Sequence, residues 1–193
     1  MLILLIGLFL FLGVHSIRLA GDGLRDRLRT QFGAGGYKAG YSILSALGLV
    51  LIIIGYGDAR TATSYVWSPP VGLRHVATLL TLVSFVMLTA AEVPRNGIKR
   101  ALRHPMVLGV KVWAFAHLLA NGSVAAIVLF GSFLVWAVLD YRSARRRDRA
   151  AGFSTPADTS AAMTALTVVI GVVLWVAFAL WGHGWLIGVK PFG

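Results

Sequence analysis

The chain contains no cysteine. This absence excludes disulfides, iron–sulfur clusters and thiolate metal sites, so a bound metal or haem iron would need His, Met, Tyr or carboxylate ligands. Charged residues make up only 13% of the 193 residues, whereas a soluble domain carries roughly a quarter. Because 58% of the residues are hydrophobic and the mean hydropathy is +0.79, the sequence predicts an integral membrane protein. We expect a single transmembrane domain over residues 1–193.

Acidic residues are also few, with seven Asp and Glu in total. All of them fall in predicted loops or at the ends of apolar runs, which argues against a di-iron carboxylate site and against a carrier driven by buried acids. The sequence has no G-x-S-x-G, H-E-x-x-H or Walker motif. The glycine-rich segment 33–36 follows no predicted strand, so we interpret it as a flexible turn rather than a phosphate loop.

Long apolar runs make up most of the sequence, and they predict an all-α, polytopic bundle of about six transmembrane helices. The runs cover residues 2–17, 39–57, 71–91, 105–120, 123–139 and 163–187. A crossing helix needs about 20 apolar residues, so the first and fourth runs are short. Helices are expected because a bilayer cannot hydrogen-bond the open edge of a sheet.

Most of the 18 Lys and Arg residues lie in the loops after the first, third and fifth apolar runs. Basic loops stay on the cytoplasmic side, so this pattern places both termini outside, in the bacterial inner membrane, with lipid around the helices. The net charge of +11 follows from this topology, and we therefore expect no nucleic-acid partner.

The five histidines fall at two predicted depths. His15 and His104 lie at the cytoplasmic level. His75 and His117 each lie about 5 Å inside the outer boundary, given the 1.5 Å rise per helical residue. Two axial ligands on one iron must bring their ring nitrogens within about 4 Å, so depth favours His75 as the partner of His117. His183, between Gly182 and Gly184, is interpreted as interfacial.

Two motifs lie at the two ends of the fourth apolar run. Trp113, His117 and Asn121 are spaced i, i+4 and i+8, which predicts a partly polar stripe on one helix face. Asn121-Gly122 predicts a tight hairpin in which Gly122 supplies a positive φ. At the other end, Arg103-His104-Pro105 starts the helix with proline at its first position, and His104 is either interfacial or binds a headgroup.

These motifs resemble the NnrU family of membrane proteins. The matching segments are Gly13-Val14-His15-Ser16, residues 37–45, Trp67-Ser68-Pro69-Pro70, Arg103-His104-Pro105-Met106, residues 113–122 and residues 130–140. This family is associated with denitrification gene clusters and is similar to the plastid 15-cis-ζ-carotene isomerase, a haem b membrane enzyme.

The resemblance implies haem b as cofactor, His15 and His117 as axial ligands, and His104 as a further functional position. Depth favours His75 instead of His15, and both alternatives stay open. The predicted metal ligands are therefore His117, His15 and His75. The predicted cofactor-binding residues are these three together with His104, Arg103, Trp113 and Asn121.

A second resemblance starts at Arg103-His104-Pro105, which is similar to a motif of membrane methyltransferases that bind S-adenosylmethionine. The chain has Val107 where that family commonly has Tyr, and it lacks the family's C-terminal Glu-Glu pair. The leading hypothesis is a haem-dependent cis–trans isomerase of a linear, lipophilic polyene. The alternatives are an assembly or regulatory factor that contacts a membrane-bound nitrogen-oxide reductase, and a methyltransferase.

Overall fold

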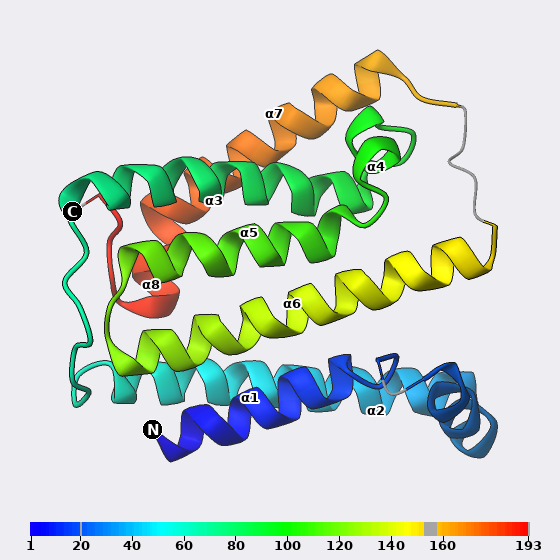
Figure 1. The fold of residues 1–193 in the computed structure, drawn as a ribbon, viewed down its shortest axis with the longest axis horizontal. Helices are drawn as coiled ribbons and strands as arrows, with labels where there is room; N and C mark the ends of the chain where they lie inside the picture. Colours follow the sequence, from blue (N-terminus) through cyan, green and yellow to red (C-terminus); the bar gives the residue numbers. More distant parts are fainter. Residues whose placement is uncertain (20, 153–157, 193) are drawn as a thin grey trace.

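The structure, a computed structural model, describes residues 1–19, 21–152 and 158–192 (Figure 1). Within this part of the chain every named element is helical. The elements are α1 (Leu2–His15), α2 (Asp22–Ala59), α3 (Val71–Glu92), α4 (Gly97–Leu102), α5 (Pro105–Ala120), α6 (Val124–Ala150), α7 (Ala161–Ala177), the π-helical turn η1 (Phe178–Gly182) and α8 (His183–Ile187). The predicted all-α class is confirmed.

Among the described residues, four helical stretches are long and apolar enough to cross a membrane, judged by length and composition. They are Gly23–Ala59, Val71–Glu92, Val124–Ala150 and Ala161–Ile187. Leu2–His15 and Pro105–Ala120 are apolar but shorter. Many large apolar side chains lie on the surface, for example Phe9, which is 77% exposed, and Trp185, which is 87% exposed. Such side chains are unfavourable in water and fit contact with lipid. The chain is therefore an integral membrane protein.

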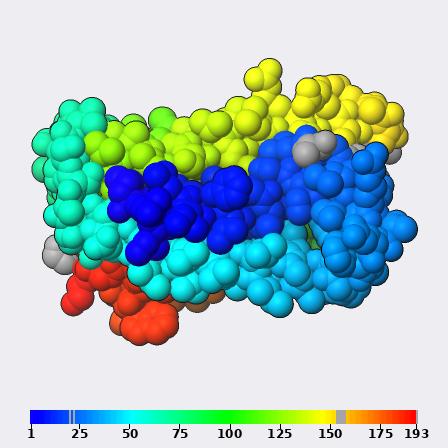
Figure 2. Space-filling view, turned by 90° about the horizontal axis from the view of Figure 1, so that it is seen from below, coloured from blue at the N-terminus to red at the C-terminus, as the bar shows by residue number. Residues whose placement is uncertain are grey.

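The helices run along a common long axis, and both termini lie at the end opposite α4 (Figure 1). α1 packs on α2, α3 packs on α5 and α7, and α5 packs on α6, which joins the two groups. Seen from below, α1 lies on the surface between α2 and α6 (Figure 2). This arrangement puts His15, the last residue of α1, between helices that are far apart in the sequence.

Three glycines hold α1 close to α2. A Cβ added at Gly7 would lie 2.6 Å from the backbone nitrogen of Ile52, and one at Gly48 would lie 2.7 Å from the backbone nitrogen of Phe11. A Cβ at Gly55 would meet the backbone nitrogen of Leu4. Small residues let membrane helices approach until their backbones touch. This contact holds α1 against α2 and so helps to set where its last residue, His15, lies.

The glycine-rich segment near the start of α2 differs from the predicted flexible turn. Gly33 alone has a non-helical conformation (φ 70°, ψ 165°), and the helix continues through Gly35 and Gly36. A single left-handed residue is enough to redirect a helix, and glycine adopts it without steric cost. The first part of α2 consequently turns across the end of the bundle (Figure 1).

At the opposite end, the predicted hairpin at Asn121-Gly122 forms part of a larger contact. The amide of Val66 donates to the Gly122 carbonyl at 2.8 Å, and the amide of Val124 donates to the Ser64 carbonyl at 3.0 Å. The predicted positive φ at Gly122 is wrong, because Gly122 is not among the positive-φ glycines of the described residues. Glycine is needed there for space, since a Cβ would lie 2.7 Å from the Trp67 carbonyl carbon.

Candidate functional site

Aromatic side chains form a continuous row through the bundle. Phe130 and Phe133 lie on one face of α6 at three-residue spacing. The Phe130 ring stacks on His117 with centroids 4.5 Å apart, and Trp113 contacts both Phe130 at 5.1 Å and Phe133 at 5.3 Å. Further contacts continue from Phe133 to Phe11 at 5.7 Å and from Phe11 to His15 at 4.2 Å. We call His117, Phe130, Trp113, Phe133, Phe11 and His15 the aromatic row.

The row separates the two histidines that the family resemblance pairs. His15 lies at 6.0 Å from Trp136, whereas His117 stacks on Phe130. Six residues of α6 separate those two contacts, which corresponds to about 9 Å along the helix. His15 and His117 therefore lie at different levels along the bundle in this structure.

A cavity of about 870 Å³ opens at the His15 end of the row. Its walls come mainly from α1, α2, α5 and α6. Apolar and aromatic residues form much of the lining: Phe11, Val14, Ile17, Tyr37, Tyr41, Leu88, Met106, Val107, Val110, Phe133 and Trp136. Besides Ala144 and Ala151, the remaining lining residues are charged or ionisable: His15, Arg18, Arg25, Lys38, His104, Asp140, Arg147 and Asp148. The combination suits a large apolar ligand that carries acidic groups.

The hydrogen bond made by His15 defines which ring nitrogen is free. Its Nδ1 lies 2.7 Å from the carbonyl oxygen of Phe11. A carbonyl can only accept, so Nδ1 is the donor, and in the neutral imidazole Nε2 keeps its lone pair. This is the arrangement that orients metal-binding histidines in proteins. Nε2 is therefore the ring nitrogen of His15 that this hydrogen bond leaves open.

Trp136 adds a second signal in the same cavity. Its indole Nε1 is buried and has no hydrogen-bond partner. Buried donors are nearly always satisfied, so a donor without a protein partner is one that a water molecule or a ligand could satisfy. Trp136 also stands edge-on to the His15 ring. Sequence reasoning did not select this tryptophan, because nothing in its local pattern shows that its donor is left without a partner.

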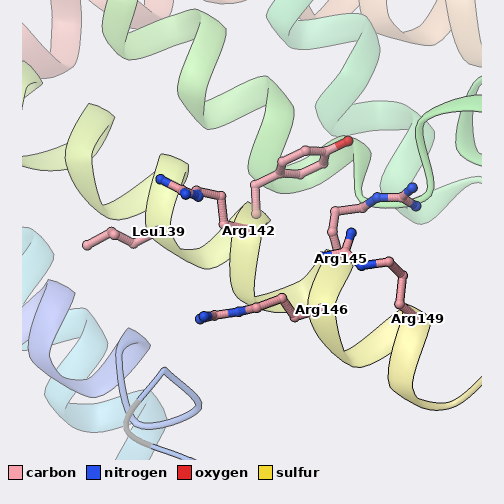
Figure 3. A pocket seen from close by; sticks show the side chains of 6 residues that line it. Leu139, Arg142, Arg145, Arg146 and Arg149 are labelled. Atoms are coloured by element: carbon pink, nitrogen blue, oxygen red, sulfur yellow. The ribbon is translucent and has the colours of Figure 1, made fainter.

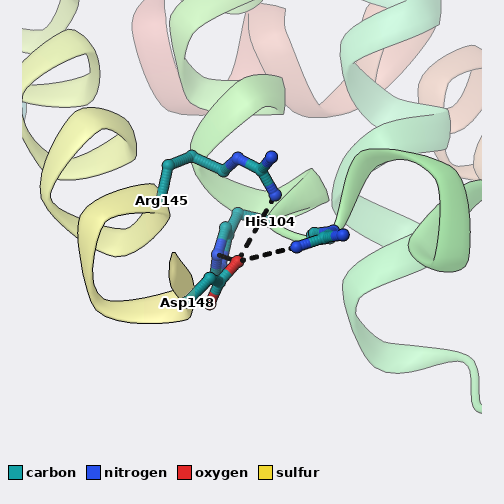
Figure 4. A network of polar contacts seen from close by, with 4 residues as sticks. His104, Arg145 and Asp148 are labelled. Atoms are coloured by element: carbon teal, nitrogen blue, oxygen red, sulfur yellow. Dashed lines mark hydrogen bonds and ion pairs between the residues drawn. The ribbon is translucent and has the colours of Figure 1, made fainter. Parts of the chain in front are cut away.

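His104 lies at the rim of the cavity in an ionic cluster with Arg103, Arg145 and Asp148 (Figure 4). One carboxylate oxygen, Oδ2 of Asp148, is 3.0 Å from His104 Nε2, 3.4 Å from Arg145 Nη1 and 3.8 Å from Arg103 Nη1. The Asp148 side chain is only 14% exposed. Sequence reasoning named Arg103 and His104 but missed Asp148, which is 44 residues further along the chain. The His104 Nε2 is occupied by this contact.

At the other end of the row, Trp113, His117 and Asn121 share one face of α5. The Asn121 side chain donates to the His117 carbonyl at 2.8 Å, and the Trp113 and His117 rings are 5.0 Å apart. The His117 Nδ1 lies 2.9 Å from the Trp113 carbonyl oxygen, so this ring repeats the hydrogen bond of His15. Its half-buried ring is packed between aromatic neighbours.

The histidine beside His117 is His183, not the depth-matched His75. The His117 and His183 rings have centroids 6.5 Å apart and are nearly parallel, at 13°. His183 directly follows η1, and π-helical turns are frequent at functional sites. His75 is exposed, because it lies two residues from buried Ala77 and so about 200° around α3 from it. Depth sets the level of a residue but not the direction in which it points.

The model of the NnrU protein family matches residues 3–191 of the chain. No curated protein and no solved structure matches it. The family match covers both ends of the aromatic row and every helix that lines the cavity.

Proposed function

The chain belongs to the NnrU protein family, and we propose that it binds haem b in the cavity beside His15. One observation carries the proposal. A cavity of about 870 Å³ with largely apolar walls contains an imidazole whose Nδ1 is fixed on the Phe11 carbonyl, so that Nε2 is available to iron. Histidine is the usual axial ligand of haem b, and this chain has no cysteine to offer instead.

The other groups around the cavity fit the same cofactor. Haem is an apolar ring with two propionate carboxylates. The cations Arg25, Lys38 and Arg147 line the cavity and would pair with carboxylates, and the buried Trp136 Nε1 offers a donor that no protein group uses. Phe11 and Phe133 supply aromatic surface for the ring. His15 would hold the iron through Nε2.

We propose further that the protein isomerises a cis double bond of a linear, lipophilic polyene. Bound haem would supply a centre that acts as a Lewis acid or exchanges one electron with a double bond. The chain's own contribution is to exclude water with Phe11, Phe133 and Val110, and to keep the His15 ring oriented through the Phe11 carbonyl. This part of the proposal rests on the sequence resemblance of the motifs around His15, His104 and His117 to those of a plastid carotenoid isomerase.

The topology that we propose has six crossings with both termini outside, in the bacterial inner membrane. The two termini lie at one end of the bundle, opposite α4, and the Arg-rich end of α6 lies at the α4 end (Figure 1). The absence of native cysteine allows a direct test. Ser64→Cys should react with a membrane-impermeant maleimide in intact cells, whereas Arg149→Cys should react only after lysis. The reverse pattern overturns the orientation.

The test of haem binding is the absorption spectrum of the protein purified after expression with ample haem. Wild type should show a Soret band, and His15→Ala should lose it. His75→Ala is the matched control, because it removes an exposed imidazole. The absence of a Soret band in wild type, or its persistence in His15→Ala, overturns the proposal.

A second set of measurements distinguishes the proposed isomerase from an assembly or regulatory factor and from a methyltransferase. The haem-loaded, reduced protein should convert a cis polyene to its trans isomer, as resolved by chromatography. Haem binding without turnover, together with co-purification of a nitrogen-oxide reductase, would favour the assembly or denitrification role. Calorimetric binding of S-adenosylmethionine would favour a methyltransferase, although the contact of His104 Nε2 with Asp148 leaves that nitrogen occupied.

A further inference from the structure

One exposed stripe runs along α6 and changes from apolar to basic. Its members are spaced by four, three, four and three residues, so they share one helix face: Val135, Leu139, Arg142, Arg146 and Arg149. Val135 is 60% and Leu139 50% exposed, and the three arginines are exposed as well. The change from apolar to basic takes three residues, or about 4.5 Å. Such a short transition from apolar to basic residues is expected where a helix passes from the acyl chains into the headgroup layer.

The basic half of this stripe forms a pocket rather than a flat surface. A cavity of about 460 Å³ is lined by Leu139, Tyr141, Arg142, Arg145, Arg146 and Arg149 (Figure 3). The arginine side chains come from successive turns of α6, with Arg142 and Arg146 extending to one side of the helix and Arg149 reaching back toward Arg145 (Figure 3). Leu139 belongs to both the apolar stripe and the pocket, so a ligand could extend from one into the other.

The arginines of the stripe differ from their neighbours on the same helix. Arg145 contacts Asp148 at 3.4 Å, and Arg147 donates to the Ser143 hydroxyl at 2.8 Å. Among the described residues, no acidic side chain forms an ion pair with Arg142, Arg146 or Arg149. Membrane topology requires only that basic residues lie on one side. It does not require three uncompensated guanidinium groups on the face that continues an apolar stripe.

We propose that this stripe binds an anionic phospholipid. Its acyl chain lies along Val135 and Leu139, and its phosphate lies among Arg142, Arg146 and Arg149. Arginine forks match phosphate oxygens in geometry and charge. Basic residues next to the membrane are worth about 1 kcal/mol each toward anionic lipid. The proposal is independent of haem, because the stripe shares no residue with the cavity beside His15.

The experiment compares lipid retention by the full chain, using native mass spectrometry after reconstitution with equal amounts of phosphatidylglycerol and phosphatidylcholine. Wild type should retain phosphatidylglycerol selectively. The double variant Arg142→Gln/Arg146→Gln should lose that retention by about tenfold or more, as expected for two contacts of this kind. The control Arg27→Gln/Arg29→Gln removes the same charge from the first part of α2 and should stay within about twofold of wild type.

Three results would overturn the proposal. They are equal retention of both lipids by wild type, equal loss in the two double variants, and displacement of the lipid by millimolar inorganic phosphate. The second result would show that only diffuse charge matters, and the third that the site recognises a free anion instead of a lipid. Circular dichroism of each variant confirms that the helices remain folded, so that loss of lipid reports on the pocket.

Discussion

His15 and His117 make the same local hydrogen bond in different surroundings. In each case Nδ1 donates to the carbonyl four residues earlier, at 2.7 Å in His15 and 2.9 Å in His117, which leaves Nε2 free. His15 lines a cavity of about 870 Å³. His117 is stacked on Phe130 and lies beside Trp113 and His183. Since their hydrogen bonding is alike, the space around each ring decides which can hold a large cofactor.

The largest expected effect tests whether His15, which lines the cavity, holds the haem. His15→Gly removes the imidazole and leaves a space of matching size, so haem content should fall at least tenfold. Imidazole added at millimolar concentration should restore the Soret band, because it can occupy that space and offer the missing nitrogen. His117→Gly should retain haem without added imidazole. Loss of haem in His117→Gly alone would transfer the site to the other end of the row.

The second effect tests the tight packing around His117. Phe130 is 4% exposed and contacts His117, Trp113 and Tyr56. Phe130→Ala should lower the free energy of unfolding by about 3–5 kcal/mol, through lost contacts and the void left behind. Denaturation in detergent measures it. Phe9→Ala is the control, since Phe9 is 77% exposed and should change the free energy little. Similar losses for the two variants would contradict the packing described.

A smaller effect is expected where α1 is fixed against α2. Gly55→Ala places a Cβ against the backbone nitrogen of Leu4 and should cost about 1–3 kcal/mol as the helices separate. Because α1 ends at His15, haem affinity should fall along with stability. Gly57→Ala serves as the control, since nothing lies within 4 Å of a Cβ there. A Gly55→Ala protein with unchanged stability would show that α1 is not held in this way.

The smallest effect concerns the ionic cluster at the cavity rim. Asp148→Asn keeps the shape but removes the charge that faces His104, Arg103 and Arg145, so we expect a loss of about 1–2 kcal/mol in unfolding free energy. Asp58→Asn, at the end of α2, should be close to neutral. The loss should shrink in high salt, and a loss unaffected by salt would indicate a steric cause.

The helices were predictable because an apolar run, and its length, is a property of consecutive residues in the sequence. Residues 105–120 were expected as one run and form α5 with the same bounds. The contacts between helices were not predictable in this way. The His104–Asp148 contact spans 44 residues, and the choice of His183 over His75 beside His117 depends on how each helix is rotated. Hydropathy reports how deep a residue lies and says little about that rotation.

The candidate site was likewise predictable in its individual residues but not in the contacts between helices. Sequence and family resemblance named His15, and the structure adds the cavity that gives its Nε2 a place to act. Trp136 was missed because its significance comes from a donor left without a partner, which only the packed structure reveals. The aromatic row likewise combines residues of α1, α5 and α6, and no single segment contains its pattern.

The π-helical turn before His183 has a consequence for how the family's sequences should be aligned. In η1 the amide of His183 donates to the Phe178 carbonyl five residues earlier, so this turn holds one residue more than an α-helical turn would. Deleting one residue from Phe178–Gly182 should restore a regular helix and rotate everything after it by about 100°. A homologue one residue shorter here would keep the histidine in its sequence while its ring no longer faced His117.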